Sequence, residues 1–190
     1  MMELRVEHLN KSYDGERVLR DVSFTAPVGL TRVAGRSGVG KTTLLRILLG
    51  LERPDGGTTN TASLRWAAAF QEDRLLGQLG AAENLRFALG AGHDACAAAR
   101  MLEELGLGDV GKKRVRDWSG GMRRRLALAR ALLAPADAVA LDEPFTGLDE
   151  ENAAAARRCI LRAAEDRIVL LVSHGEELSS VRTVTLDAEN

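Results

Sequence analysis

The sequence is poor in cysteine, in aromatic residues and in long apolar runs. Its 190 residues include 2 cysteines, and aromatic residues make up 4% of the chain. So few cysteines exclude a disulfide-stapled scaffold. Neither Cys96 nor Cys159 has a second cysteine or a histidine at zinc-ligand spacing. We therefore expect two reduced thiols that fill space in the interior.

The sequence also lacks a membrane span and a strong net charge. No run approaches the roughly 20 apolar residues that cross a bilayer, and residues 1–6 do not resemble the start of a signal peptide. We expect a cytoplasmic chain whose membrane partner, if any, is a separate protein. The formal net charge of −1 predicts no nucleic-acid partner. Basic clusters at 112–114 and 123–125 are interpreted as solvated faces, with a phosphate-backbone contact as the alternative.

What remains is the composition of a globular domain in which apolar strands alternate with helical patterns. The expected strands are 4–9, 18–25, 30–34, 64–70, 138–141, 168–172 and 182–186, and the expected helices are 41–49, 81–89, 95–105, 121–133 and 150–164. This order predicts an α/β fold with a mainly parallel sheet and an inserted helical lobe. We expect one domain over 1–190, with a core of about 1–75 and 135–190 and a lobe of about 76–134.

A glycine-rich loop lies between the expected strand at 30–34 and the helix that follows. It reads Gly35-Arg36-Ser37-Gly38-Val39-Gly40-Lys41-Thr42 and matches the G-x-x-x-x-G-K-[ST] phosphate loop. Glycines let the main chain wrap around phosphates, so that its N–H groups and the helix N-terminus face their oxygens. Lys41 would reach the β- and γ-phosphates, and Thr42 would complete an Mg²⁺ shell. The alternative is a glycine turn before an ordinary helix.

Two carboxylates, Asp142 and Glu143, end the expected strand at 138–141. The carboxyl end of a parallel strand faces the ligand crevice of an α/β sheet. Asp142 can hold Mg²⁺ through water, and Glu143 can orient or polarise the attacking water. The alternative is that the pair caps the next helix.

Together with further motifs, these residues resemble the ATP-binding cassette (ABC) family. The motifs occur in the family's order and cover the chain from residue 13 to residue 174. Trp118-Ser119-Gly120-Gly121-Met122 resembles the signature motif, and Thr146-Gly147-Leu148-Asp149 resembles the loop that meets the opposite subunit. Gln71 is similar to the glutamine that senses Mg²⁺ and couples to the membrane partner. His174 is similar to the switch histidine, and Tyr13 to the aromatic residue that stacks on adenine.

The resemblance implies a P-loop NTPase core, an antiparallel β subdomain near the adenine and a helical lobe that carries the signature. It implies ATP and Mg²⁺ as cofactors. It also implies a head-to-tail dimer, formed either by two copies of this chain or by two paired cassettes. Each ATP would lie between the phosphate loop of one chain and the signature of the other. The residues it assigns are Lys41, Glu143 and His174 for catalysis, Thr42, Gln71 and Asp142 for the metal, and Tyr13, 35–43 including Thr43, Gln71, Ser119, Gly120, Gly121 and Asp149 for the nucleotide.

Two of these residues have simpler interpretations, and three positions depart from the family pattern. Ser119 is suited to cap a helix, and Tyr13 could be a half-buried core aromatic. Trp118 and Met122 replace the usual leucine and glutamine of the signature, while the phosphate-facing serine and glycines remain. Gly175 replaces the usual acidic residue after the switch histidine.

Residues 69–76 followed by Glu83-Asn84 resemble the nitrate/sulfonate/taurine importer branch, and so does the signature followed by Arg123 and Arg125. We therefore expect an ATP-hydrolysing subunit that powers a separate membrane permease from the cytoplasmic face, with a substrate-binding protein if it imports. The segment 71–76 and the lobe should contact the permease. The alternative is a non-transport member of the family in DNA repair, iron–sulfur assembly or translation. No coiled-coil insertion, zinc cysteines or second cassette supports that alternative, and a P-loop kinase would not need the signature.

Overall fold

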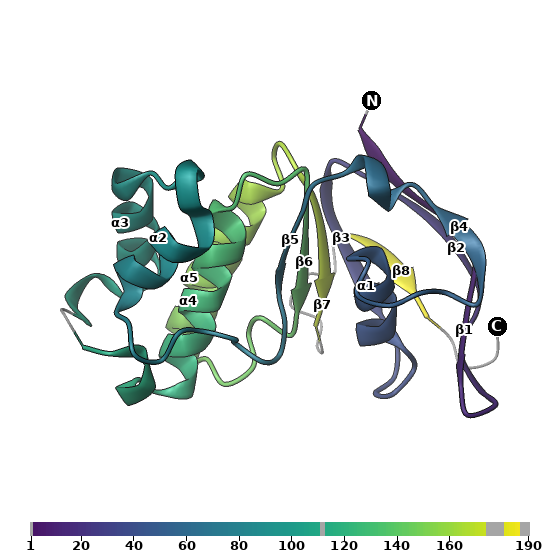
Figure 1. Cartoon of the computed structure of the whole chain (residues 1–190), viewed down its shortest axis with the longest axis horizontal. Helices are drawn as coiled ribbons and strands as arrows, with labels where there is room; N and C mark the ends of the chain where they lie inside the picture. The colour runs from purple at the N-terminus through teal and green to yellow at the C-terminus, as the bar shows by residue number, and fades with distance from the viewer. Residues whose placement is uncertain (1, 111–112, 174–180, 187–190) are drawn as a thin grey trace.

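The computed structural model describes residues 2–110, 113–173 and 181–186. It contains a helical group, a parallel sheet and an antiparallel sheet, arranged in that order along the long axis (Figure 1). The five-stranded parallel sheet has the strand order β5-β6-β7-β3-β8. Its strands are β3 Gly29–Ala34, β5 Trp66–Ala69, β6 Ala138–Asp142, β7 Ile168–Val172 and β8 Arg182–Thr185.

The central strands β6 and β7 are buried along their whole length. Helices cover both faces of the sheet. Because these two strands are buried on both faces, their sequences are almost continuously apolar. The helices are α1 Lys41–Leu48, α2 Ala81–Leu89, α3 Ala95–Glu104, α4 Gly120–Leu133 and α5 Glu150–Ala163. Leu141 and Leu171 join the core under α4 and α5, whereas Ala140 and Leu170 join the core around α1. Each fully buried leucine contributes about 2 kcal/mol of hydrophobic stabilisation.

The antiparallel sheet has the strand order β2-β1-β4. Its strands are β1 Glu3–Tyr13, β2 Glu16–Pro27 and β4 Gly56–Thr59. The turn between β1 and β2 places Asp14 and Gly15 at φ 48° and 86°, as a tight hairpin requires. Strand β4 was not expected from the sequence. Gly57 lies at φ 90°, and a Cβ there would come within 2.4 Å of the His8 carbonyl oxygen, so the close pairing with β1 needs glycine.

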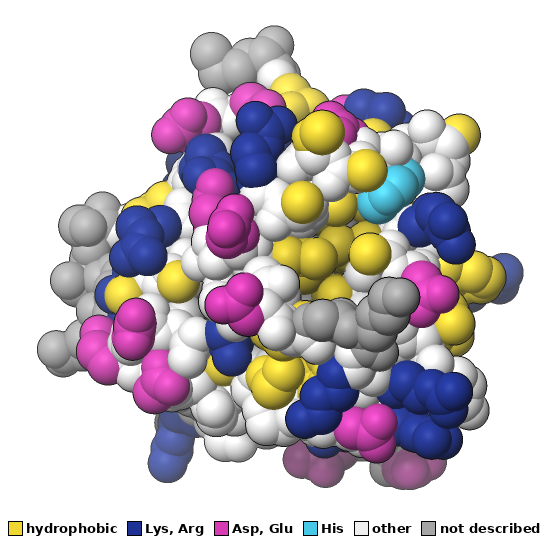
Figure 2. Space-filling model, turned by 90° about the vertical axis from the view of Figure 1, so that its left-hand side faces the viewer, with side chains coloured by type: hydrophobic (Ala, Val, Ile, Leu, Met, Phe, Trp, Pro, Cys, Tyr) yellow, Lys and Arg dark blue, Asp and Glu magenta, His cyan; other side chains and the backbone are white. Residues whose placement is uncertain are grey.

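Helices α2, α3 and α4 pack against one another at one end of the molecule. Side chains hold the starts of α2 and α3, because Glu83 accepts from the Gly80 N–H and Asp94 accepts from the N–H groups of Cys96 and Ala97. The short 3-10 helices are η1 Thr61–Ser63, η2 Gly90–Gly92, η3 Gly108–Val110 and η4 Val115–Asp117. On this helical end, apolar side chains gather in a hollow rimmed by charged ones (Figure 2).

The α/β fold expected from the sequence is confirmed, and β4 is the main addition. Within the described ranges, no helix is both long and apolar enough to pass through a bilayer. The expectation for the cysteines was half right, because Cys159 is buried whereas Cys96 is exposed. Burial, with the Glu104 carboxylate as a second cause, raises the pKa of the Cys159 thiol to about 11.

Candidate functional site

The phosphate loop joins the end of β3 to the start of α1 and is shaped by its glycines. Gly38 and Gly40 lie at φ 80° and 102°, in the left-handed region that glycine adopts without strain. A Cβ on Gly40 would lie 2.9 Å from the carbonyl oxygen of Val18 and 2.8 Å from a methyl of Leu19. Strand β2 therefore presses directly on the loop, and only glycine fits at this position.

Lys41 is almost fully buried although it is charged. Its Nζ donates to the carbonyl oxygens of Gly35 at 2.8 Å and Arg36 at 2.9 Å. These bonds lock the ammonium against the loop at the N-terminal end of α1, the positive end of the helix dipole. Two positive features converge here, which suits an anion.

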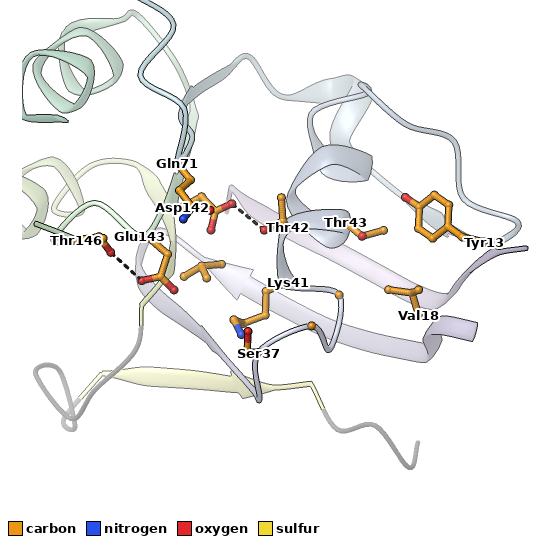
Figure 3. Close-up of a pocket in the computed structure, with 13 residues that line it drawn as sticks. Tyr13, Val18, Ser37, Lys41, Thr42, Thr43, Gln71, Asp142, Glu143 and Thr146 are labelled. Atoms are coloured by element: carbon orange, nitrogen blue, oxygen red, sulfur yellow. Dashed lines mark hydrogen bonds between the residues drawn. The ribbon is translucent and has the colours of Figure 1, made fainter. Parts of the chain in front are cut away.

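The carboxylates lie at the end of β6, as expected, with Asp142 its last residue and Glu143 the next one, and they point in different directions. Asp142 is 3% exposed and accepts a hydrogen bond of 2.9 Å from the Thr42 hydroxyl (Figure 3). Glu143 has φ 53°, a left-handed conformation that costs on the order of 1 kcal/mol for a non-glycine residue. Its N–H donates to the Val172 carbonyl at 2.9 Å, and its carboxylate accepts from the Thr146 hydroxyl at 3.4 Å. The turn separates the two acidic side chains.

These groups border one cavity of about 550 Å³. Gln71 reaches it from the segment after β5, the strand that pairs with β6. The lining residues are Tyr13, Val18, Ser37, Gly38, Gly40, Lys41, Thr42, Thr43, Gln71, Asp142, Glu143, Thr146 and Val172. Gly35, Arg36 and Val39 belong to the loop but do not line the cavity. Val39 packs into the core around α1, and a Cβ on Gly35 would lie 2.6 Å from the Leu186 carbonyl oxygen.

Tyr13 ends β1 and lies at the end of the cavity away from the carboxylates (Figure 3). Tyr13 is 40% exposed, so it lines the cavity and is not a core aromatic. The hydroxyl donates to Glu52, and the Lys11 ammonium lies 5.2 Å from the ring centroid. Partial burial, followed by the Glu52 carboxylate, raises the pKa of Tyr13.

Ser119, Gly120 and Gly121 border a second cavity, of about 600 Å³, at the start of α4. The Ser119 hydroxyl accepts from the Met122 N–H at 3.3 Å, so the serine does cap the helix. Asp149 also borders this cavity and caps α5 by accepting from the Asn152 N–H at 2.9 Å. The predicted site residues thus form two groups in one chain, not one.

The cluster at 123–125 is not a solvated face, which corrects the expectation from the sequence. Arg125 is 8% exposed and donates to the Leu105 carbonyl at 2.6 Å and to Asn152. Burial lowers the pKa of this guanidinium. Arg124 reaches the main chain of residues 70–71. In the other cluster, Lys113 and Arg114 are exposed as expected.

Three lining residues were not predicted for this site, and one predicted residue lies outside the description. Val18 and Val172 come from strands β2 and β7, and no local motif marks them. Thr146 belongs to a motif interpreted as a dimer contact, yet it donates to the carboxylate of Glu143. His174 falls in the stretch 174–180, outside the described residues.

Comparison with known proteins agrees with this geometry. The ABC transporter family matches residues 19–146. Aliphatic sulfonates import ATP-binding protein SsuB 1 of Rhizobium johnstonii is 43% identical over 153 residues, which cover 74% of this chain and 56% of that protein. Its namesake from Rhodococcus jostii is 41% identical over 175 residues, which cover 87% of this chain and 70% of that protein. The chain thus spans just over half the length of the first relative.

Solved structures share the fold. An ATP-binding subunit of an ABC transporter superposes with a TM-score of 0.87 at 23% identity, covering 98% of this chain and 87% of its own. A putative ABC transporter ATP-binding protein from Pyrococcus furiosus gives a TM-score of 0.86 at 26% identity, covering 97% and 98%. The resemblance drawn from the motifs is confirmed, and the chain belongs to the ABC transporter family as one of its ATP-binding subunits.

Proposed function

We propose that this chain binds ATP with Mg²⁺ in the first cavity, hydrolyses it with a second cassette in place, and so drives import through a separate membrane permease. One observation carries the proposal. The phosphate-loop lysine, the Thr42–Asp142 pair and Glu143 come from three separate parts of the chain and border the same cavity.

The cavity offers contacts for the phosphates and for the base of a nucleoside triphosphate. The loop amides and the N-terminus of α1 offer hydrogen bonds to phosphate oxygens, and Lys41 adds a charge on the β- and γ-phosphates. Tyr13 offers an exposed aromatic face at the opposite end, where a base can stack. Stacking needs only a flat ring, so we expect this end to select weakly between purine bases.

The donor set fits Mg²⁺. The Thr42 hydroxyl, the buried Asp142 carboxylate and the Gln71 amide are hard oxygen ligands on one side of the cavity. In the described parts of the chain no group of three His, Cys, Asp or Glu side chains could hold a metal alone. That agrees with a site completed by phosphate oxygens and water. When bound, Mg²⁺ neutralises charge on the transferred phosphoryl group.

We assign Glu143 the role of orienting the attacking water. Its left-handed turn directs the carboxylate away from Asp142, and the Thr146 hydroxyl steadies it. A carboxylate that accepts a proton from water in the transition state acts as a general base, a contribution on the order of 10²- to 10⁴-fold. His174 stays a second candidate for contact with the γ-phosphate, on sequence grounds alone.

A second molecule would supply the other half of the site. Ser119 and the two glycines after it present N–H groups at the start of α4, but they border their own cavity. A head-to-tail dimer would bring them to the partner's γ-phosphate, with Asp149 at the interface. The partner could be a second copy or another cassette.

The importer assignment rests on the relatives' names. Both sulfonate relatives are described as import ATP-binding proteins, so we assign this chain a permease and a substrate-binding protein of that class, with sulfonates as the first substrates to test. The cassette would then lie at the cytoplasmic face of the membrane. Exposed apolar side chains at Leu76 and Phe87 offer a surface for the permease.

Lys41→Ala tests the proposal. We expect purified protein to lose ATP hydrolysis by at least about 100-fold and to bind ATP much more weakly, because the charge on the β- and γ-phosphates is removed. Arg46→Ala is the matched control, since Arg46 lies exposed on the same helix. Phosphate release and nucleotide titration are the measurements. Wild-type turnover in Lys41→Ala would reject the assignment of the cavity.

A further inference from the structure

Residues 71–75 connect β5 to the helical end without regular structure. Among the described residues, no main-chain hydrogen bond holds this segment. Such a stretch has many conformations of similar energy unless side chains fix it. Yet it carries Gln71, which borders the first cavity.

Two arginines of α4 supply the missing bonds. Arg124 donates to the carbonyl oxygens of Phe70 at 3.3 Å and Gln71 at 2.7 Å. Its Nε lies 3.3 Å from a carboxylate oxygen of Asp73. Arg130 donates to the carbonyl oxygens of Asp73 at 3.0 Å and Arg74 at 2.8 Å. Planar guanidinium groups that bind two acceptors at once fix direction as well as distance.

Arg124 is the one of the two that touches Gln71. Its side chain is 12% exposed, so water competes little for these bonds. Burial raises the pKa of Asp73, and the Arg124 charge opposes that rise. The next residue, Arg125, turns the other way, toward Leu105 and Asn152.

The same helix begins in the second cavity. Ser119 caps α4, and Arg124 follows five residues later, about 7.5 Å along the axis at 1.5 Å per residue. A helix of this length moves as a rigid body. A displacement at Ser119 would therefore be carried to Arg124 and to the carbonyl oxygens it holds.

We propose that Arg124 is a positioning residue that makes the place of Gln71 in the first cavity depend on the place of α4. The inference rests on the proposed function, in which Ser119 meets the partner's nucleotide. When Ser119 contacts the partner's ATP, the resulting shift of α4 is passed along five residues of helix to the Arg124 guanidinium. Arg124 then moves Gln71, which borders the ATP bound in the chain's own first cavity. Arg124 itself borders the second cavity beside Ser119, and it acts on the first cavity only through the carbonyl oxygens that it holds.

A double-mutant cycle on ATP turnover tests whether Arg124 acts through Gln71. Arg124→Gln should lower kcat on the order of 10-fold with KM for ATP nearly unchanged. Arg124→Lys should do the same, because it keeps the charge and loses the two-pronged geometry. In a Gln71→Ala background, Arg124→Gln should change kcat less than about twofold. If the fold-decreases in kcat caused by Arg124→Gln and by Gln71→Ala simply multiply in the double variant, the two residues act independently and the inference is overturned.

Limited trypsin digestion without nucleotide tests the clamp itself and needs no activity. The fragment that begins at Leu75 should form several-fold faster in Arg124→Gln than in wild type, because the segment opens more often. Arg158→Gln is the control, since Arg158 is exposed on α5 and its loss also removes a cleavage site. A wild-type cleavage rate in Arg124→Gln overturns the inference. Absent ATPase in wild type would instead reject the proposed function.

Discussion

We assign most of the chemistry of the first cavity to the charged side chains that border it. Lys41 and Asp142 are both nearly buried, and burial of an unpaired charge costs several kcal/mol. Each is therefore held by near neighbours, Lys41 by two loop carbonyls and Asp142 by the Thr42 hydroxyl. These bonds position the charges before a ligand arrives, which lowers the cost of ordering them on binding.

Glu143→Gln should separate ATP binding from hydrolysis. Glutamine keeps the size of the side chain but loses the negative charge that favours the attacking water. The contacts of Lys41 and Thr42 survive, so affinity for ATP should hardly change. Turnover should fall by at least about 100-fold. Single-turnover hydrolysis and nucleotide titration measure the two effects.

Asp142→Asn is the contrasting variant, and it should also lose the Mg²⁺-dependent part of ATP binding. If Glu143→Gln kept most of its turnover, the water-activating role would have to lie on another residue, with His174 the next candidate.

At the scale of elements, an ion pair ties the starts of β5 and β6. Arg65 donates to the Asp137 carboxylate at 3.0 Å and 2.8 Å, and its N–H donates at 2.9 Å. These bonds lower the pKa of Asp137 from 3.8 to about 2. Since the folded value is depressed, the stabilisation is complete above the unfolded pKa and is lost as pH falls through the folded one.

The free energy of unfolding should therefore show a defined pH dependence. The difference between wild type and Asp137→Asn should be constant above about pH 5 and should shrink between about pH 4 and pH 2. Urea unfolding at several pH values measures it. In an Arg65→Gln background this pH dependence should be weaker but not absent, because the main-chain N–H of residue 65 still donates to the Asp137 carboxylate. A difference that grows on acidification would contradict the assigned pKa.

The turn before α2 and the exposed face of α2 are the elements we assign to the permease. Asn84 holds the turn by accepting from the Leu76 N–H at 2.8 Å and donating to its carbonyl at 3.0 Å. Leu76 and Phe87 are 39% and 73% exposed, whereas Leu75 packs against the core. The apolar surface that we assign to the permease contact is therefore formed by Leu76 and Phe87.

Phe87→Asp should uncouple transport from hydrolysis. We expect import in cells to be lost while ATP turnover of the isolated chain stays near wild type, because Phe87 does not border either nucleotide cavity. Leu161→Asp, at an exposed leucine on α5, is the control and should affect neither. Import at the wild-type rate in Phe87→Asp would remove α2 from the permease contact.

Elements with a strong internal pattern were predictable, and contacts between distant segments were not. The continuous apolar runs of β6 and β7 predicted buried strands, whereas β4 owes its strand state to pairing with β1. The phosphate loop is contiguous in sequence, so its residues could be named directly. The reach of Arg124 to residues 70–73 depends on tertiary packing, and a run of three arginines reads as a solvated face.

At the scale of the whole molecule, the two groups of residues that we assign to the nucleotide border separate cavities. The phosphate loop borders one cavity, and the start of α4 borders the other. Two copies related by a two-fold axis would complete two sites at once, each residue pair occurring twice. Binding of ATP between the halves would then favour the dimer, because the nucleotide contacts both chains.

Light scattering of Glu143→Gln with and without Mg-ATP tests this account most directly. Without nucleotide the chain should have the mass of a monomer, 20.5 kDa. With ATP the mass should rise to about twice that value, since hydrolysis no longer releases the partners. Gly120→Asp in the same background should stay monomeric, because Gly120 has open space within its own chain and the added charge would oppose the partner's γ-phosphate. A mass unchanged by ATP in Glu143→Gln at high protein concentration would contradict the account.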